Sequence, residues 1–386
     1  MNPSYDVVVI GGGIVGMSAA IAMRQRGFSV ALMDAGNLVV DTHVIDSRVY
    51  ALNHASQSLL QGLGVWDHLD FSRVSPYTHM HVWDGANGAH IDFDSRMQGT
   101  DRLGSIIEES VLKAALLQQL AKENIKQFPH TRVSALQMLP HGINISDGVT
   151  NWHTALLMVA DGAASKTREL LGVGTTGWSY HQQAVVATIC TEKPHQSTAY
   201  QVFNPDGPLA FLPLANPHQC SIVWSTKPSR VDALMRLSDD DFALQLKCAF
   251  AAKLGDCVVE RARHTFPLHM RHAKQYSGAC WLLMGDAAHT IHPLAGLGLN
   301  VGLADLSTWL KTLSVNKRNA FSPKSLGAYQ RERKFEVWKA IALMESLKTV
   351  FAQPLPPFVS LRGLGLTACD SLQPLKRWFI RQAAGG

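Results

Sequence analysis

The sequence lacks the patterns of several protein classes. Its six cysteines, at positions 190, 220, 248, 257, 280 and 369, form no C-x-x-C pair and no tight Cys/His cluster. This argues against a structural zinc site and fits a reducing compartment. The net charge of +5 is spread along the chain without long basic blocks, so nucleic-acid binding is not indicated.

No uninterrupted apolar run of about 20 residues is present, so no membrane-spanning helix is expected. The apolar start "VVVIGGGIVGMSAAIAM" follows Asp6 and no positive residue, which argues against a signal peptide. The sequence therefore predicts a soluble cytoplasmic protein. Basic residues are more frequent toward the C-terminal end of the sequence, in "KRNAFSPK", "QRERK" and "LKRWFIRQ". Two interpretations of them stay open: solvated helix faces, or contact of the protein with an anionic inner-membrane surface.

The first thirty-five residues carry a dinucleotide-binding pattern. "YDVVVI" is typical of a buried strand, "IVGMSAAIAMRQRG" of a helix, and "FSVALM" of a second strand that ends at Asp34. Gly11, Gly13 and Gly16 give the spacing G-x-G-x-x-G. In such a unit the glycines allow a tight turn, the approach of a pyrophosphate and close helix packing, while the acidic residue binds a ribose. The ligand is expected to be NAD or FAD.

Two more strand-to-helix corners follow far along the chain. Asp161 and Gly162 end the strand-like "TALLMVA", and Gly285 and Asp286 end "CWLLM" before the glycine-rich "GLGLN". A loop carrying Arg48 precedes a third predicted helix. Three separated corners suit a long cofactor that lies across the ends of one sheet. A metal site at Asp286, His289 and His292 would need further ligands, so no metal is predicted.

These three segments resemble the fingerprints of the aromatic-hydroxylase class of flavin monooxygenases, which share the para-hydroxybenzoate hydroxylase fold. The resemblance implies FAD, with Asp286 on the ribityl chain and a helix beginning near Gly298 directed at the pyrimidine end of the ring. Leu297 departs from the glutamine that is usual in the class. The cofactor-binding residues that the resemblance implies are Gly11, Gly13, Gly16, Asp34, Arg48, Asp161, Gly285, Asp286, Pro293, Gly296, Gly298, Leu299 and Asn300.

The stretches "DSRVYAL", "GPLAFLPL", "CSIVWST" and "HPLAGLGLNVGLAD" are similar to the ubiquinone-biosynthesis hydroxylases within this class. Glu109 departs from the asparagine that is usual there. The resemblance implies that the ring of a polyprenylated phenol is hydroxylated by reduced FAD and dioxygen. NAD(P)H or a redox partner would be the electron donor, and a biosynthetic complex could be a partner. Two alternatives stay open: a hydroxylase of another aromatic substrate, or a flavin-binding scaffold subunit.

The implied architecture is α/β, with a Rossmann-like FAD-binding lobe, an inserted antiparallel-sheet substrate lobe and a helical C-terminal region. Phe211, Leu212 and Pro213 are candidates for the wall that faces the substrate ring, with sheet core as the alternative interpretation. No catalytic base is predicted. The expected divisions are residues 1–74, 101–178 and 266–315 for the FAD-binding lobe, 75–100 and 179–265 for the substrate lobe, and 316–386 for the helical region.

Overall fold

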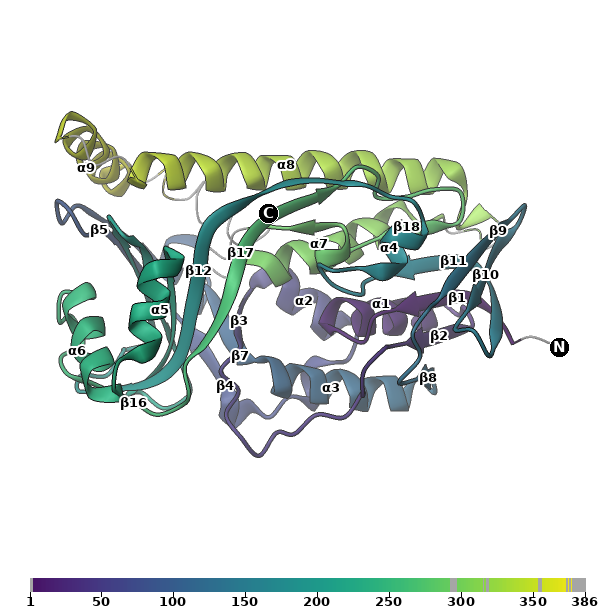
Figure 1. The fold of residues 1–386 in the computed structure, drawn as a ribbon, viewed down its shortest axis with the longest axis horizontal. Helices are drawn as coiled ribbons and strands as arrows, with labels where there is room; N and C mark the ends of the chain where they lie inside the picture. The colour runs from purple at the N-terminus through teal and green to yellow at the C-terminus, as the bar shows by residue number, and fades with distance from the viewer. Residues whose placement is uncertain are drawn as a thin grey trace.

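The computed structural model describes residues 3–291, 297–314, 316, 319–352, 356–372, 374 and 376. It has two lobes, each built on one large sheet, and a long C-terminal helix, α8, that runs along both, with α9 at the end of the second lobe (Figure 1). The α/β architecture predicted from the sequence is confirmed.

The first lobe is built on a seven-stranded sheet with the order β8-β2-β1-β11-β10-β9, to which β18 adds by pairing with β11. Strands β2, β1, β11 and β18 are mutually parallel, so their carboxyl ends lie at one edge. The valine and leucine side chains of these strands are buried on both faces of the sheet, as expected of a parallel sheet. The strands are β1 (Ser4–Ile10), β2 (Val30–Met33), β8 (Lys126–Phe128), β9 (Ala135–Leu139), β10 (Gly142–Ser146), β11 (Asn151–Val159) and β18 (Trp281–Leu283).

Helix α1 packs between α3 and α7, and short elements complete the first lobe. A three-stranded antiparallel sheet with the order β3-β7-β4 lies between the two lobes. The elements are α1 (Ile14–Gln25), β3 (Val49–Asn53), α2 (His54–Gly62), η1 (Trp66–His68), η2 (Phe71–Arg73), β4 (Val74–Tyr77), β7 (Gly104–Glu108), α3 (Glu109–Lys122), α4 (Lys166–Leu170), η4 (Gly285–Ala287) and α7 (Leu297–Thr312).

The second lobe is built on a nine-stranded sheet with the order β19-β17-β12-β15-β14-β13-β5-β6, and β16 pairs with β12. Neighbouring strands are antiparallel except β13 and β5, which are parallel because a long connection returns the chain to the sheet. The elements are β5 (His79–Asp84), β6 (His90–Asp94), η3 (Ser95–Gln98), β12 (Thr175–Thr191), β13 (Thr198–Asn204), β14 (Gly207–Pro213), β15 (Gln219–Thr226), α5 (Pro228–Arg236), α6 (Asp239–Ala249), β16 (Cys257–Val259), β17 (His264–Ala273) and β19 (His289–Thr290).

Strands β12 and β17 run side by side from one lobe to the other (Figure 1). The predicted divisions at 178/179 and 265/266 fall inside these two strands, so the lobes share them rather than meet at loops. A continuous pair of strands fixes the second sheet relative to the first.

The C-terminal region is helical, with α8 (Pro323–Ala352) and α9 (Pro356–Ser371). A buried ion pair attaches α9 to the second lobe, where Arg362 donates from Nε to Asp84 at 2.5 Å and from a terminal nitrogen at 3.1 Å. Residues 377–381, singled out as a basic and aromatic stretch, lie outside the described residues. Within the part of the chain that the structure describes, no helix is both long and apolar enough to cross a bilayer.

Asp305 of α7 joins separate segments of the chain through one fully buried carboxylate. It accepts hydrogen bonds from His289 Nε2 at 2.7 Å, Arg333 Nε at 2.6 Å and the Gly285 N–H at 2.8 Å. Burial alone would raise the pKa of Asp305, but the charges of His289 and Arg333 with these hydrogen bonds hold that pKa below its ordinary value. The corner after β18, helix α7 and helix α8 are thereby held together.

We expect Asp305→Asn to lower the free energy of unfolding by about 3–5 kcal/mol, because it leaves Arg333 buried without a counter-charge. Urea unfolding measures the change. Glu336→Gln is the matched control, since Glu336 lies on the same helix as Arg333 and forms an exposed ion pair with Lys339. The control should stay within about 0.5 kcal/mol of the parent. Equal losses from both substitutions would contradict this role of Asp305.

Candidate cofactor-binding site

A cavity of about 1190 Å³ lies between the carboxyl edge of the first sheet and one face of the second. Gly16 packs beneath it, while Pro293 and Gly296 lie outside the described residues. Of Leu297 only the backbone is described, at the start of α7. The predicted cofactor-binding residues that line the cavity are Gly11, Gly13, Asp34, Arg48, Asp161, Gly285, Asp286, Gly298, Leu299 and Asn300.

The three glycines of the first motif have distinct structural roles. A Cβ on Gly11 would lie 2.3 Å from the Ala160 carbonyl oxygen, and Gly11 has a φ of 112°. A Cβ on Gly16 would lie 1.9 Å from the Gly11 carbonyl oxygen. Both positions therefore need glycine for close backbone approach. A Cβ on Gly13 would meet no described atom within 4 Å, so this glycine leaves open space at the start of α1, where an anion is stabilised.

Asp34 lies at the end of β2 with both carboxylate oxygens fixed by backbone groups. Oδ2 accepts from the Gly12 N–H at 2.5 Å, and Oδ1 accepts from the Gly36 N–H at 2.7 Å. Each carboxylate oxygen has a second lone pair. The side chain can therefore accept hydrogen bonds from a ribose diol without losing its own support.

The other two corners each present a carboxylate to the cavity. Asp161 accepts from the Thr167 N–H through Oδ2, while its buried Oδ1 has no partner among the described residues. Asp286 follows Gly285, whose φ of 59° turns the chain sharply after β18. The Asp286 side chain opens into the cavity, and burial by the surrounding protein raises its pKa although His289 and Arg48 oppose this. Both carboxylates suit hydroxyl or amide donors of a bound ligand.

Helix α7 reaches the cavity with its first turn. A Cβ on Gly298 would meet no described atom within 4 Å, which leaves room for a flat ligand beside the backbone. The Asn300 side chain instead ties α7 to β3: its Nδ2 donates to the Ala51 carbonyl at 2.7 Å and its Oδ1 accepts from the Asn53 N–H at 3.0 Å. The open space beside Gly298, together with the carboxylates and the glycine turns, fits a dinucleotide with a planar ring.

His289, considered above as a metal ligand, is committed to Asp305. His292 lies outside the described residues. Over the residues that the structure does describe, no group of three His, Cys, Asp or Glu side chains is placed to hold a metal ion.

Arg48 lies on the cavity wall in a cluster of polar side chains. The sequence did not predict that these side chains meet. Its guanidinium donates to Glu109 Oε2 at 3.1 Å, and the Tyr50 hydroxyl donates to the same oxygen at 3.0 Å. Lys113 pairs with the other oxygen at 2.5 Å. Burial would raise the pKa of Glu109, but the hydrogen bond from Lys113 and the nearby positive charges hold it below its ordinary value. The one available signal was Glu109, which departs from the usual asparagine.

One of the three candidates for the substrate wall, Leu212, lines the cavity, and two do not. The expectation for Phe211 is wrong: its ring stacks on Phe250, with centroids 3.6 Å apart, in the core of the second lobe. Pro213 is likewise buried without lining the cavity. Successive residues of a strand point to opposite faces, so three consecutive positions cannot share one wall. The wall residues that were missed include Tyr77, Met80, Ala210, Val223 and Phe266.

Comparison with known proteins places this geometry in a family. The FAD binding domain family matches residues 4–343. The 3-demethoxyubiquinol 3-hydroxylase of Escherichia coli (strain K12) is 34% identical over 396 residues, covering 100% of this chain and 99% of the relative. The ubiquinone biosynthesis monooxygenase COQ6 of Danio rerio is 31% identical, covering 99% and 90%. The ubiquinone hydroxylase UbiL of Rhodospirillum rubrum is 31% identical, covering 98% and 89%.

Solved structures agree on the fold. The p-nitrophenol 4-monooxygenase PnpA of Pseudomonas putida DLL-E4 superposes with a TM-score of 0.81 at 19% identity, covering 100% of this chain and 99% of that one. PqsL of P. aeruginosa, in complex with 2-aminobenzoylacetate, gives 0.78 at 20% identity, covering 95% and 100%. With a full-length match above 30% identity to curated relatives, this chain belongs to the FAD-dependent hydroxylase family of ubiquinone biosynthesis, and its cofactor is FAD.

Proposed function

We propose that this protein hydroxylates the aromatic ring of a polyprenylated phenol on the route to ubiquinone. The observation that carries the proposal is that one cavity joins the three cofactor corners to an apolar wall of the second sheet. The relatives named for ubiquinone biosynthesis match the chain over its full length, which supports the same substrate class.

The residues around the cavity suit the successive parts of an FAD molecule. The start of α1 at Gly13 would receive the pyrophosphate, and Asp34 the adenosine ribose. Asp286 would bind the ribityl chain, and the start of α7 would face the pyrimidine end of the ring. Bound FAD, once reduced, would activate dioxygen, which is the source of the oxygen atom that is transferred. The protein's part is to hold both partners and to exclude water.

The face of the second sheet that lines the cavity would contact the substrate. Met80, Leu212, Val223 and Phe266 present apolar surface that suits an aromatic ring and keeps water away. Tyr77 of β4 also lines the cavity, and burial raises the pKa of its phenol to about 12, further above neutral pH than the ordinary value. Tyr77 would therefore act as a hydrogen-bond donor to an oxygen on the substrate ring.

The remaining partners of the reaction are proposed on chemical grounds. Oxygen activation needs two electrons, for which NAD(P)H or a protein redox partner is the source. A polyprenylated substrate resides in a membrane, so we propose peripheral contact with the inner-membrane surface from the cytoplasmic side, and association with other enzymes of the route. Reduction of the bound flavin with uptake of dioxygen would separate an enzyme from a flavin-binding scaffold.

We expect a strain that lacks this gene to accumulate a prenylated phenol short of one ring hydroxyl. Mass spectrometry of its quinone lipids measures this, and the position of the missing oxygen names the step. The gene restored on a plasmid should return the normal quinone pool. An unchanged pool in the deletion strain, together with normal FAD content of the purified protein, would refute this substrate and leave the cofactor assignment intact.

We expect Arg48→Ala to weaken FAD binding about tenfold, the loss typical of one charge-assisted contact. Equilibrium dialysis of the apoprotein against FAD measures the dissociation constant. Arg96→Ala is the control, because Arg96 is 82% exposed and pairs only with Asp94 two residues away. Unchanged affinity in the Arg48 variant would remove Arg48 from the cofactor site.

Two adjacent residues of β14 should give opposite phenotypes. Leu212→Ala opens the wall to water, so we expect more of the consumed dioxygen to appear as hydrogen peroxide, with little change in stability. Phe211→Ala leaves a void in the core of the second lobe and should lower the free energy of unfolding by about 3–5 kcal/mol. Peroxide yield and urea unfolding of both variants test the pair, and the same phenotype in both would contradict the assignment of faces.

A further inference from the structure

The loop of residues 35–48 connects β2 to β3 without helix or strand, yet it carries Arg48 into the cavity. We propose that the ion pair of Arg73 and Glu108 is a positioning pair that sets Arg48 at the FAD site by clamping this loop. The inference rests on the proposed role of Arg48 in FAD binding and assigns a task to two residues outside the cavity wall.

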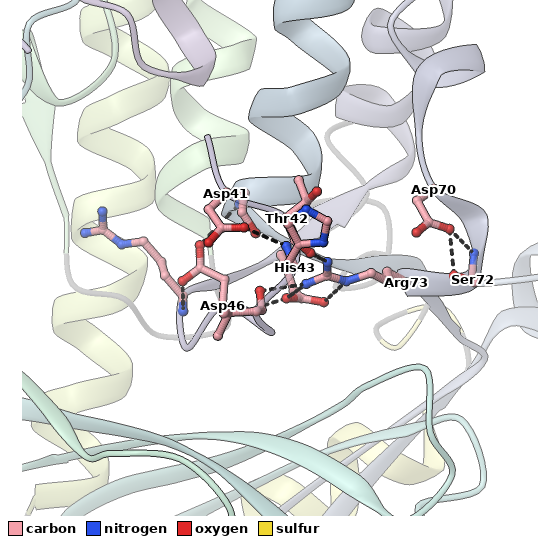
Figure 2. A network of polar contacts seen from close by, with 11 residues as sticks. Asp41, Thr42, His43, Asp46, Asp70, Ser72 and Arg73 are labelled. Atoms are coloured by element: carbon pink, nitrogen blue, oxygen red, sulfur yellow. Dashed lines mark hydrogen bonds and ion pairs between the residues drawn. The ribbon is translucent and has the colours of Figure 1, made fainter. Parts of the chain in front are cut away.

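Arg73 holds the loop by its backbone. One terminal nitrogen of its guanidinium donates to the Thr42 carbonyl, and the other donates to the Val44 carbonyl at 3.1 Å. Figure 2 shows the Arg73 side chain extended to the loop beside Thr42 and His43, with Asp46 close by. Carbonyls of an irregular loop have no regular partners, so a single guanidinium that binds two of them restricts the loop strongly.

The same guanidinium is fixed on Glu108. Arg73 Nε donates to Glu108 Oε1 at 2.9 Å, and a terminal nitrogen donates to Oε2. The two side chains are only 18% and 7% exposed. Strands β4 and β7 pair antiparallel with Val74 opposite Ile107, which places Arg73 and Glu108 opposite each other at the end of the small sheet. This two-pronged geometry uses the fork of arginine in a way that lysine cannot reproduce.

Contacts continue from Glu108 to the backbone of Arg48. Glu108 Oε2 accepts from the Asp46 N–H at 2.5 Å. The Asp46 carboxylate in turn accepts from the Arg48 N–H at 2.9 Å and from the Ser110 N–H at 3.2 Å. The Arg48 carbonyl accepts from the Glu109 N–H at 3.0 Å. Both backbone groups of Arg48 are thus tied to the junction of β7 and α3.

Two consecutive glutamates at this junction bind different parts of the loop. Glu108 acts on the loop backbone from outside the cavity, and Glu109 receives the Arg48 guanidinium inside it. The Arg48 side chain remains 64% exposed, so packing alone does not hold it. A long cationic side chain that is ordered beforehand loses less conformational freedom when a ligand binds. Disordering the loop should therefore weaken FAD binding through Arg48.

A double-mutant cycle tests this dependence. FAD dissociation constants of the apoprotein are measured for the parent, Arg73→Ala, Arg48→Ala and the double variant. We expect each single substitution to weaken binding about tenfold, and the double variant to bind no more weakly than Arg48→Ala. Losses that multiply in the double variant, or full affinity in Arg73→Ala, would overturn the proposal, because general destabilisation acts on both backgrounds alike.

Further variants keep the test decisive if Arg73→Ala fails to fold. Arg73→Lys retains the charge, but its three N–H donors on one atom cannot replace the four hydrogen bonds that the guanidinium makes to Glu108 and the two carbonyls. The same cycle with lysine should therefore give a smaller loss that again vanishes in the Arg48→Ala background. Arg96→Ala should leave FAD affinity unchanged. FAD affinity is measured without substrate, so a normal quinone pool in the deletion strain would refute the proposed substrate and leave this result standing.

Discussion

The buried carboxylate of Asp305 is the interaction on which the cofactor site depends. It accepts the Gly285 N–H and thereby fixes the turn that presents Asp286, while His289 and Arg333 compensate its charge. The same carboxylate belongs to α7, whose first turn reaches the cavity. A charge buried this deeply tolerates only one arrangement of its partners, because each missing hydrogen bond is costly without water. Stability and cofactor geometry are therefore coupled at one residue.

A second constraint sets the distance between the carboxyl edge of the first sheet and the face of the second sheet that lines the cavity. Strands β12 and β17 run paired from one lobe to the other, with one irregularity between Ser179 and Gln182, so the sheet that carries Leu212 is tied to the first lobe by two strands. Hydroxylation by a flavin depends on holding the ring close and on excluding water. A shared pair of strands serves this need better than a hinge, because the strands of the second sheet continue into the lobe that lines the other side of the cavity.

The loop that carries Arg48 is held in a different way. It has no regular structure of its own, and polar contacts to Arg73, Glu108 and Asp46 replace the missing ladder hydrogen bonds. Most of these contacts are to backbone atoms, so they specify where the chain runs and leave the Arg48 side chain to Glu109. Buried charged side chains thus hold the irregular backbone of this loop, just as the buried Asp305 carboxylate holds the turn at Gly285.

The family, the cofactor and the three corners follow from the sequence alone. The reason is that part of each corner is a local backbone constraint, visible as a fixed spacing: Gly16 must approach the Gly11 carbonyl closely, and Gly285 turns the chain with a φ of 59°. Which residue of a strand faces a ligand is set by its pairing and by what covers its other face. Leu212 and Phe211 could therefore be assigned only when α5, α6 and the cavity were seen on opposite sides of the second sheet. Contacts between Arg48 and Glu109 join residues distant in the chain, and only the tertiary structure brings such charges together.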